Sequence, residues 1–264
     1  MDIKRFMAIE GEKPLDNIVE DGGFFKIFRT VGCIGDSLSS GEFESKNQYG
    51  HAGYHDYYEY SWGQFMAREA GVKVYNFSKG GMTAKAFCDS FAATCGVYKE
   101  ENICQAYIIA LGVNDLNHGQ EIGTTEDIGK EGSYGNGESF AGYLGQIIKI
   151  LKTKQPKAKI FLMSMPKDEN AEKNEQKEKF AKLLYDIADM YEGLYVIDLF
   201  KYAPVYDKEF KRNFFLGGHM NAAGYVLTAK MVMSYIDYII RNNPEDFAQV
   251  GFIGKGVYNM EAKW

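Results

Sequence analysis

The sequence predicts an α/β fold in which a parallel sheet is flanked by helices. Short apolar runs rich in β-branched residues alternate with segments in which apolar residues recur every three or four positions. The runs are apolar enough to be buried on both faces, as strands in the centre of a parallel sheet are. We expect at least five strands, at residues 28–34, 72–77, 106–111, 159–163 and 194–199.

Helices are expected between these strands. The clearest spans residues 138–154, where apolar side chains from Phe140 to Leu151 line one face and Pro156 follows the end. The same pattern predicts further helices at residues 62–70, 83–94, 172–191 and 221–241. Asn221 is the expected N-cap of the last one.

Composition indicates one globular domain. The chain has 264 residues, 45% of them hydrophobic and 25% charged, which is enough for one large core. Residues 1–27 and 243–264 lack a strong period and are expected to pack on that domain. The net charge of −6 is spread along the chain, so we expect no nucleic-acid partner.

The amino-terminal residues mix charges with apolar side chains, so the sequence predicts neither a signal peptide nor a membrane span. As written, the chain is predicted to be cytoplasmic, although a secreted protein lacking its leader would look the same. Four cysteines without a C-x-x-C pair are expected to be reduced thiols. A disulfide between Cys88 and Cys95 is the alternative.

Two stretches, residues 41–60 and 115–137, are expected to be long loops beyond strand ends, where open α/β sheets bind ligands. The first is rich in tyrosine and suits a stacking platform for a sugar ring, a lid over an acyl group, or local packing. His51 and His55 would share a face of a helix and suit a metal, but the neighbouring Gly50 and Gly53 favour a loop without one.

Residues that can act as a nucleophile or donate hydrogen bonds follow three of the predicted strands. Ser37 follows the first strand in Gly-Asp-Ser-Leu, and Asn114 follows the third in Gly-Val-Asn-Asp. Ser37 alone favours a helix-capping turn, but the two segments together converge on one edge of the sheet. Glycines 80 and 81 follow the second strand and can expose a backbone N–H, and His219 precedes the last helix.

These segments resemble the SGNH/GDSL hydrolase family. The GDSL block, the glycine block, the GxND block and a late HxNxxGY segment occur in this order over residues 35–225. The resemblance implies a three-layer, flavodoxin-like fold and a serine esterase that needs no cofactor or metal. It implies Ser37 as nucleophile, His219 as base and an oxyanion hole from Ser37 N–H, Gly81 N–H and the Asn114 amide. Gly80 is the neighbouring candidate for the glycine donor.

The chemistry supports these residue types independently. A serine hydroxyl is a poor nucleophile until an adjacent base with a pKa near the working pH, such as imidazole, takes its proton. Hydrogen-bond donors then stabilise the oxyanion of the tetrahedral intermediate. Asp36 and Asp115, beside the two blocks, are expected to accept backbone N–H bonds and hold the loops in place.

One position departs from the family. Leu216 stands three residues before the histidine, where the family usually has the aspartate that orients the ring. We expect a backbone carbonyl of Leu216 or Gly217 to accept the Nδ1 proton instead. The alternatives are a carboxylate from elsewhere, Asp198 first and then Asp207 or Glu42, and the loss of catalysis.

The sequence therefore predicts hydrolysis of a carboxylic ester through an acyl-enzyme. A small acyl group, acetyl, on a carbohydrate or a similar polar molecule is preferred, because the predicted loops are polar and aromatic. A lipid or thioester hydrolase is the alternative enzyme. A catalytically weak glycan-binding protein is the alternative outside the enzymes.

Overall fold

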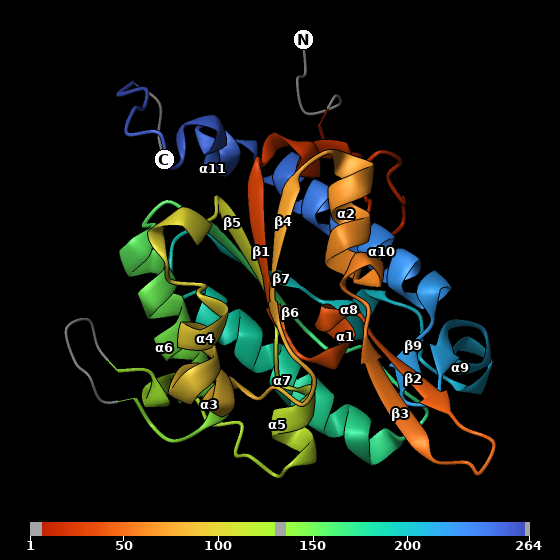
Figure 1. Cartoon of the computed structure of the whole chain (residues 1–264). Coiled ribbons are helices and arrows are strands. Elements are labelled where there is room, and N and C mark those ends of the chain that lie inside the picture. Colours follow the sequence, from red (N-terminus) through yellow and green to blue (C-terminus); the bar gives the residue numbers. More distant parts are fainter. Residues whose placement is uncertain (1–6, 130–135, 262–264) are drawn as a thin grey trace.

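A parallel sheet forms the centre of the protein in the computed structural model, which describes residues 7–129 and 136–261 (Figure 1). Its strands lie in the order β4-β1-β5-β6-β7, and all neighbours are parallel. The strands are β1 (Thr30–Gly35), β4 (Lys73–Ser78), β5 (Ala106–Ala110), β6 (Lys159–Met163) and β7 (Leu194–Ile197). This is the flavodoxin-like order 2-1-3-4-5, so the predicted fold is confirmed.

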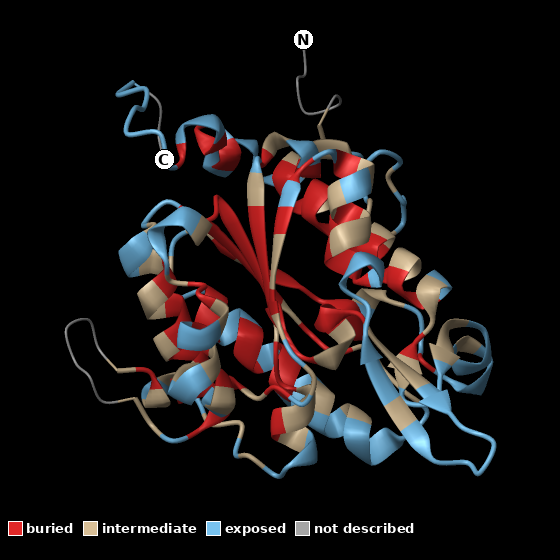
Figure 2. Cartoon of the chain, viewed as in Figure 1, coloured by how far each residue is buried: buried red, intermediate tan, exposed pale blue. Residues whose placement is uncertain are grey.

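Two helical layers cover the sheet. One face is covered by η2 (Gly23–Ile27), α2 (Trp62–Ala70), α10 (Ala222–Asn242) and α11 (Pro244–Phe247). The other is covered by α3 (Ala84–Ala86), the π-helical η4 (Phe87–Phe91), α4 (Ala92–Cys95), α6 (Phe140–Lys154) and α7 (Ala171–Ala188). Four of the strands are buried along most of their length, whereas the edge strand β4 is partly exposed (Figure 2). Side chains alternate between the layers, with Tyr107 facing one layer and Ile108 the other.

The predicted helices are present, and their caps explain where they begin. Ser61 caps α2, Ser139 caps α6, and Asn221 caps α10 as predicted, its Oδ1 accepting the Gly224 N–H at 2.9 Å. The helix expected at 83–94 forms as three consecutive segments, α3, η4 and α4, because its middle adopts π-helical bonding.

The stretch 41–60 differs from the expected loop. It folds into an antiparallel hairpin of β2 (Glu42–Lys46) and β3 (Ala52–Asp56), followed by η3 (Tyr58–Tyr60). The Asn47 side chain closes the turn by accepting the N–H groups of Tyr49 and His51. Both faces of the hairpin carry polar residues, so the alternation that reveals a half-buried strand is missing from the sequence.

Shorter elements occupy the ends of the strands. They are α1 (Ser37–Ser40), η5 (Glu100–Asn102), α5 (Val113–Asn117), η6 (Thr125–Asp127), α8 (Leu199–Tyr202), α9 (Lys208–Phe214), β8 (Phe215–Leu216), β9 (His219–Met220) and η7 (Val250–Phe252). Residues 115–137 are otherwise irregular where they are described. In Figure 1 the β2–β3 hairpin extends beyond the sheet beside β9 and α9.

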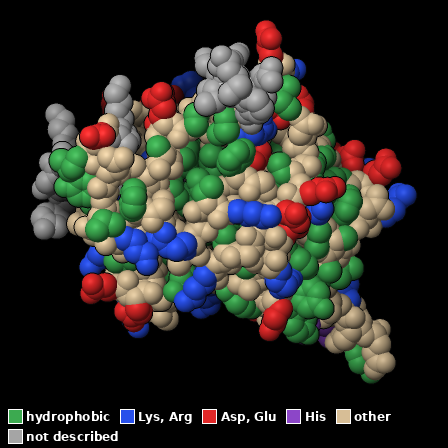
Figure 3. Space-filling view, turned by 90° about the horizontal axis from the view of Figure 1, so that it is seen from above, with side chains coloured by type: hydrophobic (Ala, Val, Ile, Leu, Met, Phe, Trp, Pro, Cys, Tyr) green, Lys and Arg blue, Asp and Glu red, His purple; other side chains and the backbone are tan. Residues whose placement is uncertain are grey.

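The segments near the two ends of the described chain pack on the α10 face. Phe25 is fully buried there, and Glu12 forms an ion pair with Arg241 at 2.7 Å. Arg29 donates to the carbonyls of Gly251 and Ile253. On the face seen in Figure 3, basic and acidic side chains are interspersed.

All four cysteines are unpaired, as predicted, and no Cys88–Cys95 disulfide forms. Among residues 7–129 and 136–261, no helix is both long and apolar enough to cross a bilayer.

Candidate active site

The nucleophile candidate lies in a tight turn at the carboxyl end of β1. Asp36 caps α1, and its Oδ1 accepts the Leu38 N–H at 3.0 Å. Ser37, the first residue of α1, is partly buried. The expected support role of Asp36 is confirmed, and it places Ser37 where the strand order reverses between β1 and β5.

Asn114 follows β5 on the other side of this crevice. Its Nδ2 donates to the Met82 carbonyl at 3.1 Å and, more weakly, to Asp36 Oδ2 at 3.4 Å. The amide therefore ties together the turns after β1, β4 and β5. The predicted Asn114 is brought beside Asp36, the chain neighbour of Ser37.

The glycine segment forms a turn between β4 and α3. Met82 N–H donates to the Lys79 carbonyl at 3.2 Å, and Gly81, the third residue of the turn, has a φ of +71° that favours glycine. Gly81 is exposed, with open space where a Cβ would lie, whereas Gly80 lies against the Glu42 carboxylate. Asp115 holds the start of α3, because its Oδ1 accepts the N–H of Ala84 at 3.0 Å, as expected.

His219 comes from a second, smaller hairpin. β8 and β9 pair antiparallel around the two-residue turn of Gly217 and Gly218, and Gly217 has a φ of +65°. β9 contacts both α1 and β2. The topology therefore brings His219 to the helix that begins with Ser37.

Two glutamates of β2 face the imidazole. Glu42 Oε1 lies 3.0 Å from His219 Nε2, and Glu44 Oε2 lies 3.7 Å from Nδ1. Glu44 also accepts the Gly218 N–H at 2.6 Å, and the Tyr54 ring contacts the imidazole edge-on at 5.5 Å between centroids. Sequence reasoning ranked Glu42 low and missed Glu44. The sequence feature that could have identified Glu44 is its position two residues after Glu42, because residues two apart in a strand have their side chains on the same face.

The expected backbone acceptor for His219 is not formed. The Nδ1 atom is buried and makes no hydrogen bond to any described residue, so neither the Leu216 nor the Gly217 carbonyl accepts its proton. Asp198 lies elsewhere: it caps α8 and bonds Ser164 Oγ at 3.0 Å and Tyr185 OH at 3.2 Å. Asp207 caps α9.

The surroundings shift the pKa values of the carboxyls in different directions. Burial raises the pKa of Asp36 to about 7, and the charges of Asp115 and Glu42 contribute to this rise. The hydrogen bond from the Leu38 N–H acts in the opposite direction and lowers the pKa. Burial also raises the pKa values of Asp115 and Glu42. The pKa of Glu44 is lowered, first by the Gly218 N–H bond and further by His219.

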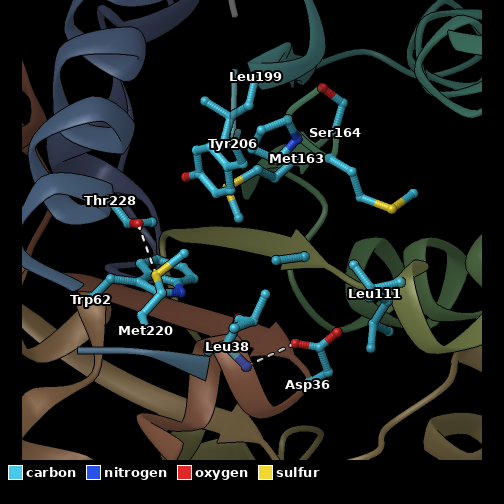
Figure 4. A pocket seen from close by; sticks show the side chains of 15 residues that line it. Asp36, Leu38, Trp62, Leu111, Met163, Ser164, Leu199, Tyr206, Met220 and Thr228 are labelled. Atoms are coloured by element: carbon cyan, nitrogen blue, oxygen red, sulfur yellow. Dashed lines mark hydrogen bonds between the residues drawn. The ribbon is translucent and has the colours of Figure 1, made fainter. Parts of the chain in front are cut away.

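Two cavities adjoin the turn that carries Ser37. The inner one, of about 60 Å³, is mostly apolar, and side chains such as Leu38, Met163 and Met220 converge on it in Figure 4. The outer cleft, of about 510 Å³, shares Leu38, Val113 and Tyr206 with the inner cavity. Its wall adds polar side chains, among them the Lys177–Asp168 ion pair at 3.0 Å.

The two hairpin histidines are not on a helix. His51 lies in the β2–β3 turn, and His55 Nε2 is 2.8 Å from Ser45 Oγ across the hairpin. Within the described part of the chain, no cluster of three His, Cys, Asp or Glu side chains has the arrangement of a metal site.

Comparisons with known proteins bear on the family and the fold of this chain. A sequence profile of the GDSL-like lipase/acylhydrolase family matches residues 33–227. No curated protein matches the sequence significantly.

Solved structures share the fold at low identity. A family two carbohydrate esterase from Clostridium thermocellum, in complex with cellohexaose, is 15% identical with a TM-score of 0.57, covering 90% of this chain and 67% of that one. A family 3 carbohydrate esterase from the same organism is 14% identical, with a TM-score of 0.51 and coverages of 81% and 97%. A G-D-S-L family protein described as lipolytic, from Desulfitobacterium hafniense, is 16% identical, with a TM-score of 0.52 and coverages of 78% and 99%.

Proposed function

Because this chain belongs to the GDSL-like lipase/acylhydrolase family, we propose that it is a serine esterase that removes an acetyl group from a carbohydrate or a similarly polar substrate. The observation that carries the proposal is the convergence of three segments at the strand-order switch. Ser37 follows β1, Asn114 follows β5, and β9, which begins with His219, contacts α1.

The mechanism uses the chain's own groups. Ser37 Oγ attacks the ester carbonyl while His219 accepts its proton, and the same imidazole then protonates the leaving alcohol. The N–H groups of Ser37 and Gly81 and the Asn114 amide stabilise the oxyanion. Water, activated by His219, attacks the acyl-Ser37 ester and releases the carboxylic acid.

The cavities favour a small acyl group and a polar alcohol. The inner cavity of about 60 Å³ is small and mostly apolar, which suits an acetyl group better than a long acyl chain. The outer cleft of about 510 Å³ lies within the range of small-molecule sites. Its wall combines ring faces, such as Tyr206 and Phe215, with polar groups such as Asn117 and Gln176, as sugar binding requires.

The fold neighbours guide the choice of substrates, because two of them are carbohydrate esterases and one holds cellohexaose. The test is release of p-nitrophenol from acetyl, butyryl and octanoyl esters, and of acetate from acetylated cello-oligosaccharides, with a chelator present. The parent is compared with Ser37→Ala and with Ser90→Ala, a matched change at an exposed serine on η4.

We expect turnover of acetyl esters by the parent and by Ser90→Ala, and its loss in Ser37→Ala. Turnover that persists in Ser37→Ala would remove the serine from its role. A preference for octanoyl esters would favour a lipid hydrolase. Binding of cello-oligosaccharides by a parent that turns over no ester would favour a glycan-binding protein.

A further inference from the structure

The histidine lies between two carboxylates of one strand, and these cannot play the same part. An imidazole that acts as a general base must present one nitrogen to the nucleophile while the other nitrogen carries a proton. Glu42 Oε1 lies 3.0 Å from Nε2, and Glu44 Oε2 lies 3.7 Å from Nδ1. Which nitrogen faces the reaction therefore decides which glutamate orients the ring.

The surroundings of the glutamates identify the reaction side of the ring. Glu42 lies against Gly80 of the glycine turn, and its charge acts on Asp36, the neighbour of the nucleophile. Nε2 therefore faces the nucleophile and the oxyanion donors. Glu44 lies instead against Gly217 and Gly218, in the turn just before the histidine, so Nδ1 faces away from the reaction.

Glu44 is also held firmly in this place. It accepts the Gly218 N–H at 2.6 Å, and the bare Cα of Gly217 makes room for its carboxylate, since a Cβ there would overlap it. Its side chain keeps only 12% of its exposure. A charged acceptor anchored beside a buried Nδ1 that makes no hydrogen bond among the described residues is placed to receive the Nδ1 proton.

We propose that Glu44 is the positioning residue of this site: the carboxylate that orients His219, delivered from the β2–β3 hairpin instead of from position 216. This inference rests on the proposed esterase function. Glu44 would hold the neutral ring as its Nδ1–H tautomer, so that Nε2 can accept the Ser37 proton, and would stabilise the imidazolium that forms. Glu42, on the reaction side, is the partner that the Ser37 hydroxyl must replace at Nε2.

The titratable groups around the ring come from β2, β3 and α10. β2 supplies Glu42 and Glu44, together with Lys46, whose charge acts on Glu44. β3 supplies Tyr54 and Asp56, the cross-strand partner of Glu42, and α10 supplies Tyr225, whose hydroxyl donates to the Glu42 carbonyl at 2.6 Å. The described residues of α1 and β8 add no charge. The ring nitrogens of His219 can be followed by NMR and assigned with His219→Asn.

In Glu44→Gln, the His219 ring is expected to lose its preference for the Nδ1–H tautomer, because the charged acceptor of the Nδ1 proton is removed. Glu59→Gln, a matched change at an exposed glutamate of η3, should leave the tautomer unchanged. An unchanged tautomer in Glu44→Gln would overturn the proposal, whether or not the protein turns over esters.

The kinetic test uses p-nitrophenyl acetate. Glu44→Gln is expected to lower kcat by about 10²-fold, within the ~10⁴-fold loss known for a triad aspartate changed to asparagine. Glu44→Asp should retain more activity than Glu44→Gln, which a purely packing role would not explain.

Rescue and comparison separate the two glutamates. Leu216 is the cross-strand partner of His219, so a carboxylate at position 216 can reach the ring. Adding Leu216→Asp to Glu44→Gln should therefore raise kcat at least about 10-fold above that of Glu44→Gln alone. A larger loss in Glu42→Gln than in Glu44→Gln would assign the orienting role to Glu42 and overturn the proposal. If the parent shows no Ser37-dependent turnover, the esterase function fails, and the tautomer of His219 still decides the role of Glu44.

Discussion

Two pairs of carboxylates lie at the carboxyl edge of the sheet, and they differ in their partners. Asp36 and Asp115 are 2% and 1% exposed, and they accept the backbone N–H groups of Leu38 and Ala84. Glu42 and Glu44 keep 15% and 12% of their side-chain exposure and face a histidine.

The partners explain the difference between the pairs. A backbone N–H does not titrate, so the aspartates of the first pair, here called the framework pair, fix the loops that present Ser37 and Asn114. An imidazole carries a proton on either of two nitrogens, so the glutamates of the second pair, the hairpin pair, can select its tautomer. The same chemical group supports the backbone in one place and tunes a base in the other.

The largest effect is expected at Asn114, which the framework pair helps to place. Asn114→Ala removes the amide proposed to donate to the oxyanion, and kcat should fall by about 10²–10³-fold. The esterase assay checks it, with Asn242→Ala, an exposed asparagine at the end of α10, as the control. A loss of kcat below about 10-fold in Asn114→Ala would show that the Asn114 amide does not donate to the oxyanion.

Removing a framework carboxylate should destabilise the fold. Asp115→Ala leaves the buried Ala84 N–H without its acceptor, and the free energy of unfolding should fall by about 1–3 kcal/mol. Urea denaturation measures it. Asp115→Asn, which keeps an oxygen acceptor, and Glu44→Gln on the hairpin should each cost less. An equal loss of unfolding free energy in Asp115→Ala and Glu44→Gln would show that the two pairs contribute equally to the stability of the fold.

The raised pKa of Asp36 predicts a pH dependence of stability. In the folded state the value is about 7 against an ordinary 3.8, so between these values the folded protein holds a proton that the unfolded chain releases. Stability due to Asp36 is therefore greatest below about pH 4 and falls as pH rises to about 7. The slope is about 1.4 kcal/mol per pH unit, and Asp36→Asn should remove it while keeping the Leu38 bond.

Urea denaturation of the parent and of Asp36→Asn between pH 4 and 8 gives this difference directly. Parallel stability curves for the two proteins would show that Asp36 ionises in the folded state at its ordinary pKa.

The smallest effect is expected from adding a third carboxylate. Leu216 is 48% exposed and lies opposite His219, so Leu216→Asp should change the free energy of unfolding by less than about 0.5 kcal/mol. With Glu44 in place, kcat should change by less than about 3-fold, because the proposal already gives Nδ1 an acceptor in Glu44. A large rise in kcat would show that the hairpin pair does not orient the ring.

The sequence by itself determined the sheet, the helices and three of the segments that meet at the site. Buried parallel strands are continuous apolar runs, and amphipathic helices repeat every three or four residues, so both are visible locally. The observed strands begin and end within two residues of the predicted positions. The turns after β1, β4 and β5 were predictable because parallel strands present their carboxyl ends on one edge.

The partner of the histidine was decided only by the tertiary structure. The β2–β3 hairpin carries polar residues on both faces, so the sequence shows a loop where the chain forms strands. Gly218 and Glu44 are 174 residues apart, and nothing in the local sequence predicts their hydrogen bond. Leu216 shows that an acid is missing before His219, but only the packing of β2 against β9 shows that Glu44 lies where it is needed.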